Sequence, residues 1–237
     1  MNRTMNDFEV MAPVGSRDSL AAAIKAGADS VYFGIGQLNM RSHSANHFTI
    51  SDLQEIAATC NEHDIKSYLT VNTIIYDNDL QTMREIIDAA KVAVSGKCYM
   101  SLADSGRSAN CGECIQICRR SYLLTDAETG NQIEVDNKYL MSPKDLKTVR
   151  FIDKLMSSGV RVFKIEGRAH GPEYVYTVVK VYREAIAAVL NGGFTEEKKD
   201  EWDQRLATVF NPGFWDGYYQ GQRLLIISAA SAAVILL

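Results

Sequence analysis

The 237-residue sequence lacks several features that mark special classes of protein. It has no run of about 18 apolar residues, the length that a membrane helix needs. Its first residues include no apolar stretch of the kind found in signal peptides. The most apolar segment, residues 224–237, is too short to span a membrane. We therefore expect neither a membrane span nor an export signal, which indicates a cytoplasmic protein.

The sequence also lacks an excess of one charge and the even number of cysteines that a disulfide framework uses. The 25 Lys and Arg against 29 Asp and Glu leave a net charge of −4, whereas a general nucleic-acid coat needs clustered cations. The five cysteines are odd in number, so a disulfide framework is not expected in a chain without an export signal. With 46% hydrophobic and 23% charged residues, the chain has globular proportions, which exclude general disorder.

The motifs of two large hydrolase classes are missing as well. The four histidines form no HExxH pair, which zinc peptidases use, and no GxSxG turn of the serine hydrolases is present. A Cys nucleophile with a His base has no local sequence support. The residues by themselves therefore support peptidase activity only weakly.

Strands and helices are predicted to alternate along most of the chain. Apolar and β-branched segments predict strands at residues 8–13, 30–34, 66–75, 139–141 and 161–165. Helical spacing of apolar residues predicts helices at 19–26, 52–64, 77–91, 143–156 and 173–190, the second of them capped by Ser51 and Asp52. This alternation favours an α/β fold with a parallel sheet. Five such units are too few to close a barrel, which needs eight.

The pattern divides the chain into four regions. Residues 1–91 hold the first βα units, and residues 92–137 form a cysteine-rich region with a hairpin that turns at 128–131. Residues 138–223 hold the later βα units, and 224–237 are an atypical tail.

The cysteine-rich region contains a candidate metal site. Its tight part is a C-x2-C-x3-C run, with a further cysteine upstream, and nearby Arg and Lys favour the thiolate form. A structural zinc ion and an iron–sulfur cluster both use such thiolates, and the spacing alone does not choose between them. The candidate ligands are Cys98, Cys111, Cys114 and Cys118.

Several long motifs carry a family resemblance: MAPVGSRDSLAAAIKAGADSVYFG, GRSANCGECIQICRRSY, YLMSPKDL, GVRVFKIEGR and FNPGFWDGYY. Over residues 8–223 the sequence resembles the collagenase-like peptidase family. Bacterial members of that family include tRNA wobble-uridine hydroxylation proteins, an rRNA cytidine hydroxylase and paired ubiquinone hydroxylation proteins. The motifs are most similar to the tRNA hydroxylation branch.

The resemblance implies a fold, a cofactor and a co-substrate. The implied fold is a (β/α)8 TIM-like barrel, which here is incomplete. Hydroxylases of the family hold a four-iron, four-sulfur cluster on four cysteines, and the tRNA branch uses prephenate as a co-substrate. We therefore expect a cysteine-held iron–sulfur cluster, with zinc as the other metal considered, and a small carboxylate as a partner.

The sequence departs from the family at one junction. Lys91 runs directly into Val92, whereas family members have about 100 further residues there, roughly what three βα units of a barrel need. We expect a gapped barrel that lacks these units. The tail after Arg223 is also unlike the family.

Two of the four usual cluster cysteines are replaced. Lys91 stands before VAVSGKC and Lys147 stands after SPKDL, where relatives have cysteine. The ligands that remain at family positions are Cys98 and Cys118, and their neighbours Cys111 and Cys114 can substitute for the lost pair.

Candidate catalytic residues follow two of the predicted strands. Glu166 and Arg168 close the strand at 161–165, at the barrel end where active sites lie. Glu166 can act as an acid or base, and Arg168 can bind a carboxylate or phosphate bidentately; alternatively the two form a surface ion pair. Arg41 and Asn46 lie in the loop after the strand at 30–34, with a self-packed polar loop as the other interpretation.

Two further segments can contact RNA. The aromatic segment 210–219 can stack on bases, although an apolar plug that closes the barrel is the favoured interpretation. A set of cations can follow a tRNA backbone or form a solvated helix face, and we favour the first. The set is Arg119, Arg120, Lys144, Lys147, Arg150 and Lys154.

Together these features predict an enzyme that hydroxylates the wobble uridine of tRNA, with tRNA and a small carboxylate as partners. The alternatives are a collagenase-like peptidase acting on peptides and a non-catalytic assembly partner.

Overall fold

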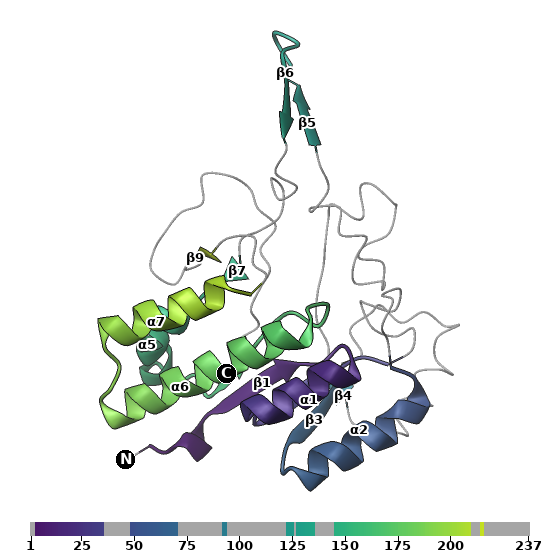
Figure 1. Ribbon diagram of the computed structural model, residues 1–237, viewed down its shortest axis with the longest axis vertical. Coiled ribbons are helices and arrows are strands. Elements are labelled where there is room, and N and C mark those ends of the chain that lie inside the picture. The colour runs from purple at the N-terminus through teal and green to yellow at the C-terminus, as the bar shows by residue number, and fades with distance from the viewer. Residues whose placement is uncertain are drawn as a thin grey trace.

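The computed structural model describes residues 3–35, 48–70, 92–93, 122–125, 127–135, 145–209 and 214–215. Within these residues, strands and helices alternate around a parallel sheet (Figure 1). The predicted α/β class is confirmed.

The central sheet has five strands in the order β4-β3-β2-β1-β8, and each neighbouring pair is parallel. The bounds are Glu9–Pro13 for β1, Ser30–Phe33 for β2, Lys66–Thr70 for β3, Val92–Ala93 for β4 and Val162–Lys164 for β8. The strands predicted at 8–13, 30–34 and 161–165 are thus confirmed. The prediction for 66–75 is confirmed as far as Thr70, and residues 71–75 lie outside the described residues.

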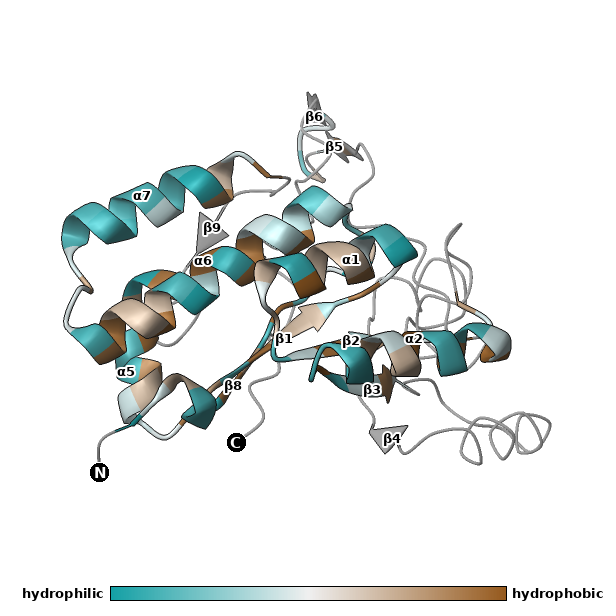
Figure 2. Ribbon diagram, turned by 60° about the horizontal axis from the view of Figure 1, so that its bottom comes forward, coloured by the Kyte–Doolittle hydropathy of each residue, from teal (hydrophilic) through white to brown (hydrophobic). Residues whose placement is uncertain are grey.

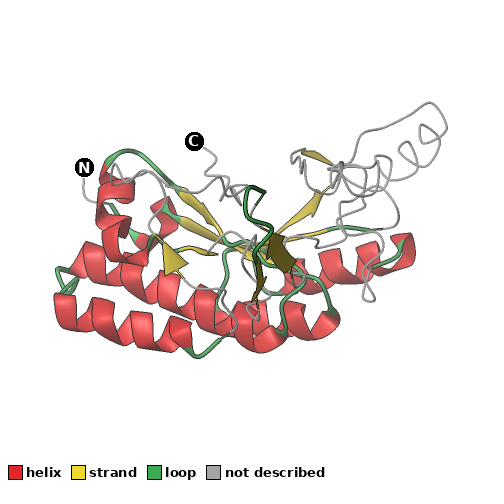
Figure 3. Ribbon diagram, turned by 90° about the horizontal axis from the view of Figure 1, so that it is seen from above, coloured by secondary structure: helices red, strands yellow, loops and turns green. Residues whose placement is uncertain are grey.

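The main helices lie on one face of this sheet (Figure 3). They are α1 (Arg17–Ala26), α2 (Ile50–Glu62) and α6 (Pro172–Asn191), and α1 packs along α6. Doubly wound folds cover both faces of the sheet with helices, whereas βα barrels keep their helices outside. In the described residues the helices lie on one face of the sheet and β8 lies beside β1. Closure of the barrel is not shown by the described strands.

Side chains that alternate along the strands separate an apolar face from a polar face. Val10, Val31, Leu69 and Phe163 are buried in the core between sheet and helices. Figure 2 colours the ribbon by hydropathy, with brown stretches in β8 and teal over most of α7. Because successive side chains point to opposite faces, the other face carries polar and aromatic residues. They include Glu9, Ser30, Tyr32, Lys66, Tyr68, Thr70, Lys164 and Glu166.

Local signals explain where the helices begin and end. In α1, the hydroxyl of Ser16 accepts a hydrogen bond from the backbone N–H of Ser19, and Gly27 ends the helix with a left-handed φ of 82°. The predicted cap of α2 at Ser51 and Asp52 is wrong, because Thr49 is the N-cap. Asp52, three residues later, completes a capping box with Thr49.

The single helix predicted at 143–156 is also wrong for its first half. Asp145–Leu146 form β7, Val149–Phe151 a 3₁₀ turn (η5), and only Ile152–Ser157 an α helix (α5). The backbone N–H of Thr148 donates to the Tyr182 hydroxyl at 3.1 Å. Because the Thr148 N–H is bonded to a side chain of α6, it does not form the backbone hydrogen bond of a regular helix.

Three more elements complete the described structure. The predicted hairpin is confirmed as the antiparallel pair β5 (Tyr122–Thr125) and β6 (Gln132–Val135), which projects from the body in Figure 1. Helix α7 (Glu196–Ala207) was not predicted, and β9 (Phe214–Trp215) pairs with β7. The predicted helix 77–91 and strand 139–141 lie outside the described residues. None of the described helices has the length and apolar character of a membrane span.

Candidate functional site

The carboxyl ends of β1, β2, β3 and β8 meet at one edge of the sheet, because the strands are parallel. Open and closed α/β sheets bind their ligands at this edge. Here the edge carries Glu166 and Arg168, the two predicted catalytic residues that the structure describes. It also brings Tyr32, Thr70 and Lys164 to them.

Glu166 follows β8 and is held between two donors. Its Oε1 lies 2.9 Å from Lys164 Nζ, and the two side chains are 46% and 15% exposed, respectively. Its Oε2 lies 3.0 Å from the Tyr32 hydroxyl. The carboxylate is thus oriented by a cation and a phenol and still reaches solvent.

Tyr32 is the buried centre of this group, with 2% of its surface exposed. Its hydroxyl lies 2.9 Å from the Ile165 carbonyl oxygen, so its one hydrogen is donated either to that oxygen or to Glu166. Burial, and then the negative charge of Glu166, raises the pKa of Tyr32 well above its usual value. The phenol is therefore neutral and a hydrogen-bond donor at physiological pH.

Two cations lie against the Tyr32 ring. Lys164 Nζ is 4.6 Å from the ring centroid, and Arg168 Cζ is 5.8 Å from it. Both distances allow cation–π attraction. Arg168 also donates a hydrogen bond from Nη1 to Thr70 Oγ1 at 2.9 Å. The structure does not support an ion pair between Glu166 and Arg168 on the surface, because Glu166 forms its ion pair with Lys164.

The loop after β8 is shaped by Gly167. Its φ of 135° is rarely adopted by other residues, and a Cβ there would lie 2.6 Å from the His170 ring and 2.7 Å from the Tyr174 ring. The two rings stack with centroids 4.1 Å apart. Tyr174, from α6, donates its hydroxyl hydrogen to the Glu166 carbonyl at 3.0 Å. The sequence Glu166-Gly167-Arg168 is thus bound to both the sheet and α6.

The combined chemistry is that of an anion-binding site with an acid–base group. Arg168 supplies the anion-binding group, because an arginine fork matches a carboxylate or phosphate, whereas the charge of Lys164 is paired with Glu166. Glu166, oriented and accessible, can accept or return a proton. Tyr32 can donate a hydrogen bond from a buried position.

The remaining predicted site residues lie outside the described residues. They are Arg41, Asn46, Cys98, Cys111, Cys114 and Cys118. Within the described ranges, no three His, Cys, Asp or Glu side chains are grouped as metal ligands. The fifth cysteine, Cys60, is buried in α2, and burial raises the pKa of its thiol. A raised pKa makes Cys60 an unreactive core residue.

Position 147, where the resemblance places a cluster cysteine, does not suit a metal ligand in this chain. The Lys147 side chain is 12% exposed, and its Nζ lies 2.9 Å from Asp203 Oδ1 of α7. A protonated amine paired in this way has no electron pair for iron. The usual four-position cysteine set is therefore not met here, whatever ligands the cysteine-rich region supplies.

Two members of the basic set that was predicted to follow an RNA backbone form ion pairs with the acidic helix α7. Arg150 forms ion pairs with Glu196, Asp200 and Asp203 of α7. Lys147 joins the same acidic helix. Contact of this set with RNA therefore stays a prediction.

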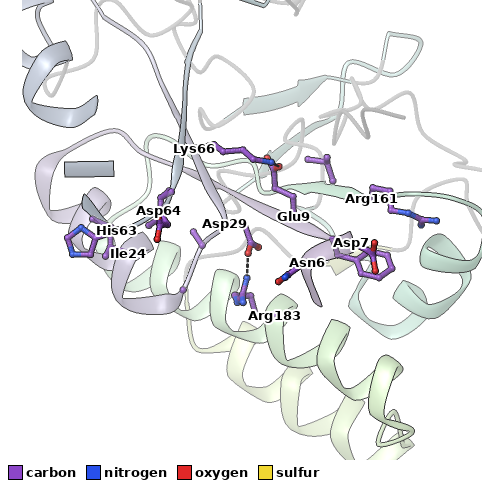
Figure 4. A pocket seen from close by; sticks show the side chains of 15 residues that line it. Asn6, Asp7, Glu9, Ile24, Asp29, His63, Asp64, Lys66, Arg161 and Arg183 are labelled. Carbon is purple, nitrogen blue, oxygen red and sulfur yellow. Dashed lines mark hydrogen bonds and ion pairs between the residues drawn. The ribbon is translucent and has the colours of Figure 1, made fainter. Parts of the chain in front are cut away.

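A pocket of about 620 Å³ lies at the opposite, amino-terminal edge of the sheet (Figure 4). Two ion pairs lie in its lining: Lys66 Nζ lies 2.6 Å from Glu9 Oε2, and Arg183 faces Asp29. Asp29 Oδ2 also accepts a hydrogen bond from the backbone N–H of Val10 at 2.9 Å. These contacts join α6 and the strand starts, which is a stabilising role typical of this end of βα folds.

Sequence reasoning missed Tyr32, Thr70 and Lys164. Each lies on the strand face opposite the apolar core. Their period-two spacing with buried neighbours could have identified them as residues on the polar face. Their convergence on Glu166 and Arg168 needed the register of four strands.

Comparison with known proteins places the amino-acid sequence of this chain in a family. The model of peptidase family U32 matches residues 15–93 and 86–225. The two matches meet at the junction where a missing segment is predicted. A collagenase of Porphyromonas gingivalis is 45% identical over 311 residues, covering 93% of this chain and 75% of that protein. This alignment is longer than the 237-residue chain, which supports the predicted gap.

RNA-modifying proteins are related more distantly, so the expected order of similarity is reversed. A tRNA hydroxylation protein of Bacillus subtilis is 24% identical, covering 90% of this chain and 71% of that protein. A 23S rRNA 5-hydroxycytidine synthase of Escherichia coli is 25% identical, covering 80% and 41%. No solved structure matches significantly. The family match extends over most of the chain, and the protein belongs to peptidase family U32.

Proposed function

We propose that this protein is an RNA-modifying enzyme that hydroxylates a pyrimidine base, with the wobble uridine of tRNA as substrate. Relatives whose names state tRNA or rRNA hydroxylation cover 80% to 90% of the chain. The parallel sheet, with helices on one face and β8 beside β1, supports a (β/α)8-type barrel as the complete fold.

The observation that carries the proposal is the position of Arg168 against the Tyr32 ring, beside the Lys164–Glu166 ion pair. Lys164 and Arg168 both lie against the Tyr32 ring, at the edge where βα folds bind substrate. Such a site suits an anion, either a nucleotide phosphate or the carboxylates of a co-substrate such as prephenate. A peptide bond is neutral and would not need an arginine at this position.

The roles follow from the geometry. Arg168 binds the anionic group through its guanidinium, and Lys164 orients Glu166 through their ion pair. Glu166 is the acid–base group, and Tyr32 holds it from the buried side. Arg41 and Asn46 are proposed to complete the site from the loop after β2.

A metal centre is proposed on Cys98, Cys111, Cys114 and Cys118. An iron–sulfur cluster there would supply electron transfer, and zinc is the other candidate. Because Lys147 is paired with Asp203, the ligands must come from the cysteine-rich region without residue 147.

The test is the amount of hydroxylated wobble uridine in tRNA from cells that carry single variants. Arg168→Ala should lower it strongly, since a charge-assisted bidentate contact is worth about 2–3 kcal/mol, or roughly 30- to 150-fold in binding. Cys98→Ser and Cys118→Ser should also lower it. Arg17→Ala is the control, because Arg17 is 57% exposed and pairs only with surface carboxylates. Normal hydroxylation in all variants would contradict the proposal.

A peptidase is the second candidate, favoured by the 45% identity to a collagenase-named relative. It predicts that the pure protein cleaves denatured collagen without added RNA. Cleavage that Glu166→Gln abolishes and Arg17→Ala leaves unchanged would establish this activity in place of the first.

A further inference from the structure

Arg168 is joined to the sheet through one hydroxyl group. Its Nη1 donates to Thr70 Oγ1 at 2.9 Å, and Thr70 Oγ1 donates to the carbonyl oxygen of Phe33 at 2.9 Å. A hydroxyl has one hydrogen, and here it is directed to Phe33, so a lone pair of Thr70 faces the guanidinium. The ends of β2 and β3 thus orient a side chain that follows β8.

The backbone of Arg168 is fixed by a different strand. Gly15 follows β1, and a Cβ built on it would lie 1.9 Å from the Arg168 carbonyl oxygen. Gly15 is not among the residues with positive φ, so its backbone conformation does not require glycine. Glycine is required because the Arg168 carbonyl oxygen lies where the side chain of any other residue would begin.

The guanidinium and the backbone carbonyl of Arg168 are therefore both held in place without a ligand. A free arginine side chain loses rotamer freedom when it binds, and fixing it beforehand lowers that loss. The Tyr32 ring, 5.8 Å from Arg168 Cζ, adds a further surface against which the guanidinium rests.

We propose that Thr70 is a positioning residue that presets the Arg168 guanidinium for an anionic group, while Gly15 seats the Arg168 backbone. This inference rests on the proposed function, in which Arg168 is the anion-binding group. Thr70 touches no substrate itself and acts through Arg168.

The experiment measures the dissociation constant of inorganic phosphate for the full chain by NMR titration of the ¹⁵N-labelled protein. Thr70→Val keeps the shape and removes the hydroxyl, and it should weaken binding about 10-fold, the effect of losing one oriented hydrogen bond. Thr70→Ser restores the hydroxyl and should bind within about 2-fold of the unchanged protein. Arg168→Ala should remove the binding.

Thr148→Val is the matched control for loss of a threonine hydroxyl. Thr148 Oγ1 lies 3.0 Å from the Tyr182 hydroxyl, in the interior beside α6. This variant should lower the melting temperature and leave phosphate binding unchanged. If Thr70→Val is not folded, the comparison of Thr70→Ala with Thr70→Ser replaces it.

The outcomes separate the two hypotheses. Normal binding by Thr70→Val, with binding lost in Arg168→Ala, would overturn the positioning role and leave the anion site intact. Normal binding by Arg168→Ala would overturn the anion site, and the role of Thr70 with it. Weakened binding by Thr70→Ser equal to that of Thr70→Val would show that packing, not the hydroxyl, is responsible.

Discussion

Replacing Tyr32 by Phe removes one oxygen from the buried side of the site and keeps the ring. The hydroxyl lies within hydrogen-bond distance of the Ile165 carbonyl and of Glu166. Loss of a buried hydrogen bond that leaves its partner unsatisfied costs about 1–3 kcal/mol. Because Glu166 keeps Lys164 and solvent, we expect a loss near the lower end, about 1–2 kcal/mol of unfolding free energy. For a chain of this size, that lowers the melting temperature by roughly 2–8 °C.

The same variant should change the response to alkaline pH. Burial and the charge of Glu166 raise the pKa of Tyr32 above its usual value of 10.0. Below that pH, the phenol is protonated in both the folded and the unfolded protein. Above it, the unfolded chain loses the proton first, so the unfolding free energy falls as pH rises, by up to about 1.4 kcal/mol per pH unit for one group.

The assay is urea unfolding at pH 8, 10 and 11. Tyr32→Phe should be less stable than the unchanged protein at pH 8, and the difference should shrink at pH 11. Tyr182→Phe is the control: burial also raises the pKa of Tyr182, so it should show the same trend without loss of phosphate binding or tRNA hydroxylation. An unchanged slope above pH 10 in Tyr32→Phe would refute the buried, neutral phenol.

Three further predictions concern single contacts. Gly15→Ala should displace the Arg168 backbone, because the new Cβ would lie 1.9 Å from its carbonyl oxygen; phosphate binding should be lost, and binding equal to that of the unchanged protein would contradict the packing. Thr49→Ala should remove the N-cap of α2 and lower the unfolding free energy by about 1 kcal/mol, measured by urea unfolding, with no effect on tRNA hydroxylation. Asp203→Ala should remove the carboxylate that pairs with both Lys147 and Arg150 and lower the unfolding free energy by about 2 kcal/mol; Asp203→Ala combined with Lys147→Met should regain part of this loss, and no regain would argue against the Lys147–Asp203 ion pair.

Local sequence signals predicted the elements whose pattern is self-contained. The strands β1, β2 and β8 and the helices α1 and α6 begin and end within a few residues of their predicted bounds. In each, alternation or helical spacing coincides with a cap or a glycine stop. The segment 143–156 failed because its backbone is bonded to Tyr182 of α6. Tyr182 lies 34 residues further along the chain, so a local sequence pattern does not predict the contact.

The candidate site divides in the same way. Glu166 and Arg168 were placed correctly at the end of a strand, since a polar Glu-Gly-Arg run after an apolar strand is a local signal. Their partners were not predictable, because the hydroxyls of Tyr32 and Thr70 reach them only through strand pairing. The ion pairs of Arg150 were not predictable for the same reason: its acidic partners lie on α7, which was not predicted.

The sequence by itself determined the α/β class, the order of the elements and the candidate residues at one strand end. These depend on side-chain periodicity and on caps, which act over a few residues. Tertiary structure decided which of these residues act together. It brought Arg168 into contact with Thr70 and Gly15, placed Glu166 beside Lys164, and paired Lys147 and Arg150 with a carboxylate of α7. Contacts of this kind depend on the register of strands and the packing of helices that are distant in sequence. Burial then determines the strength of the electrostatic interaction between the charges.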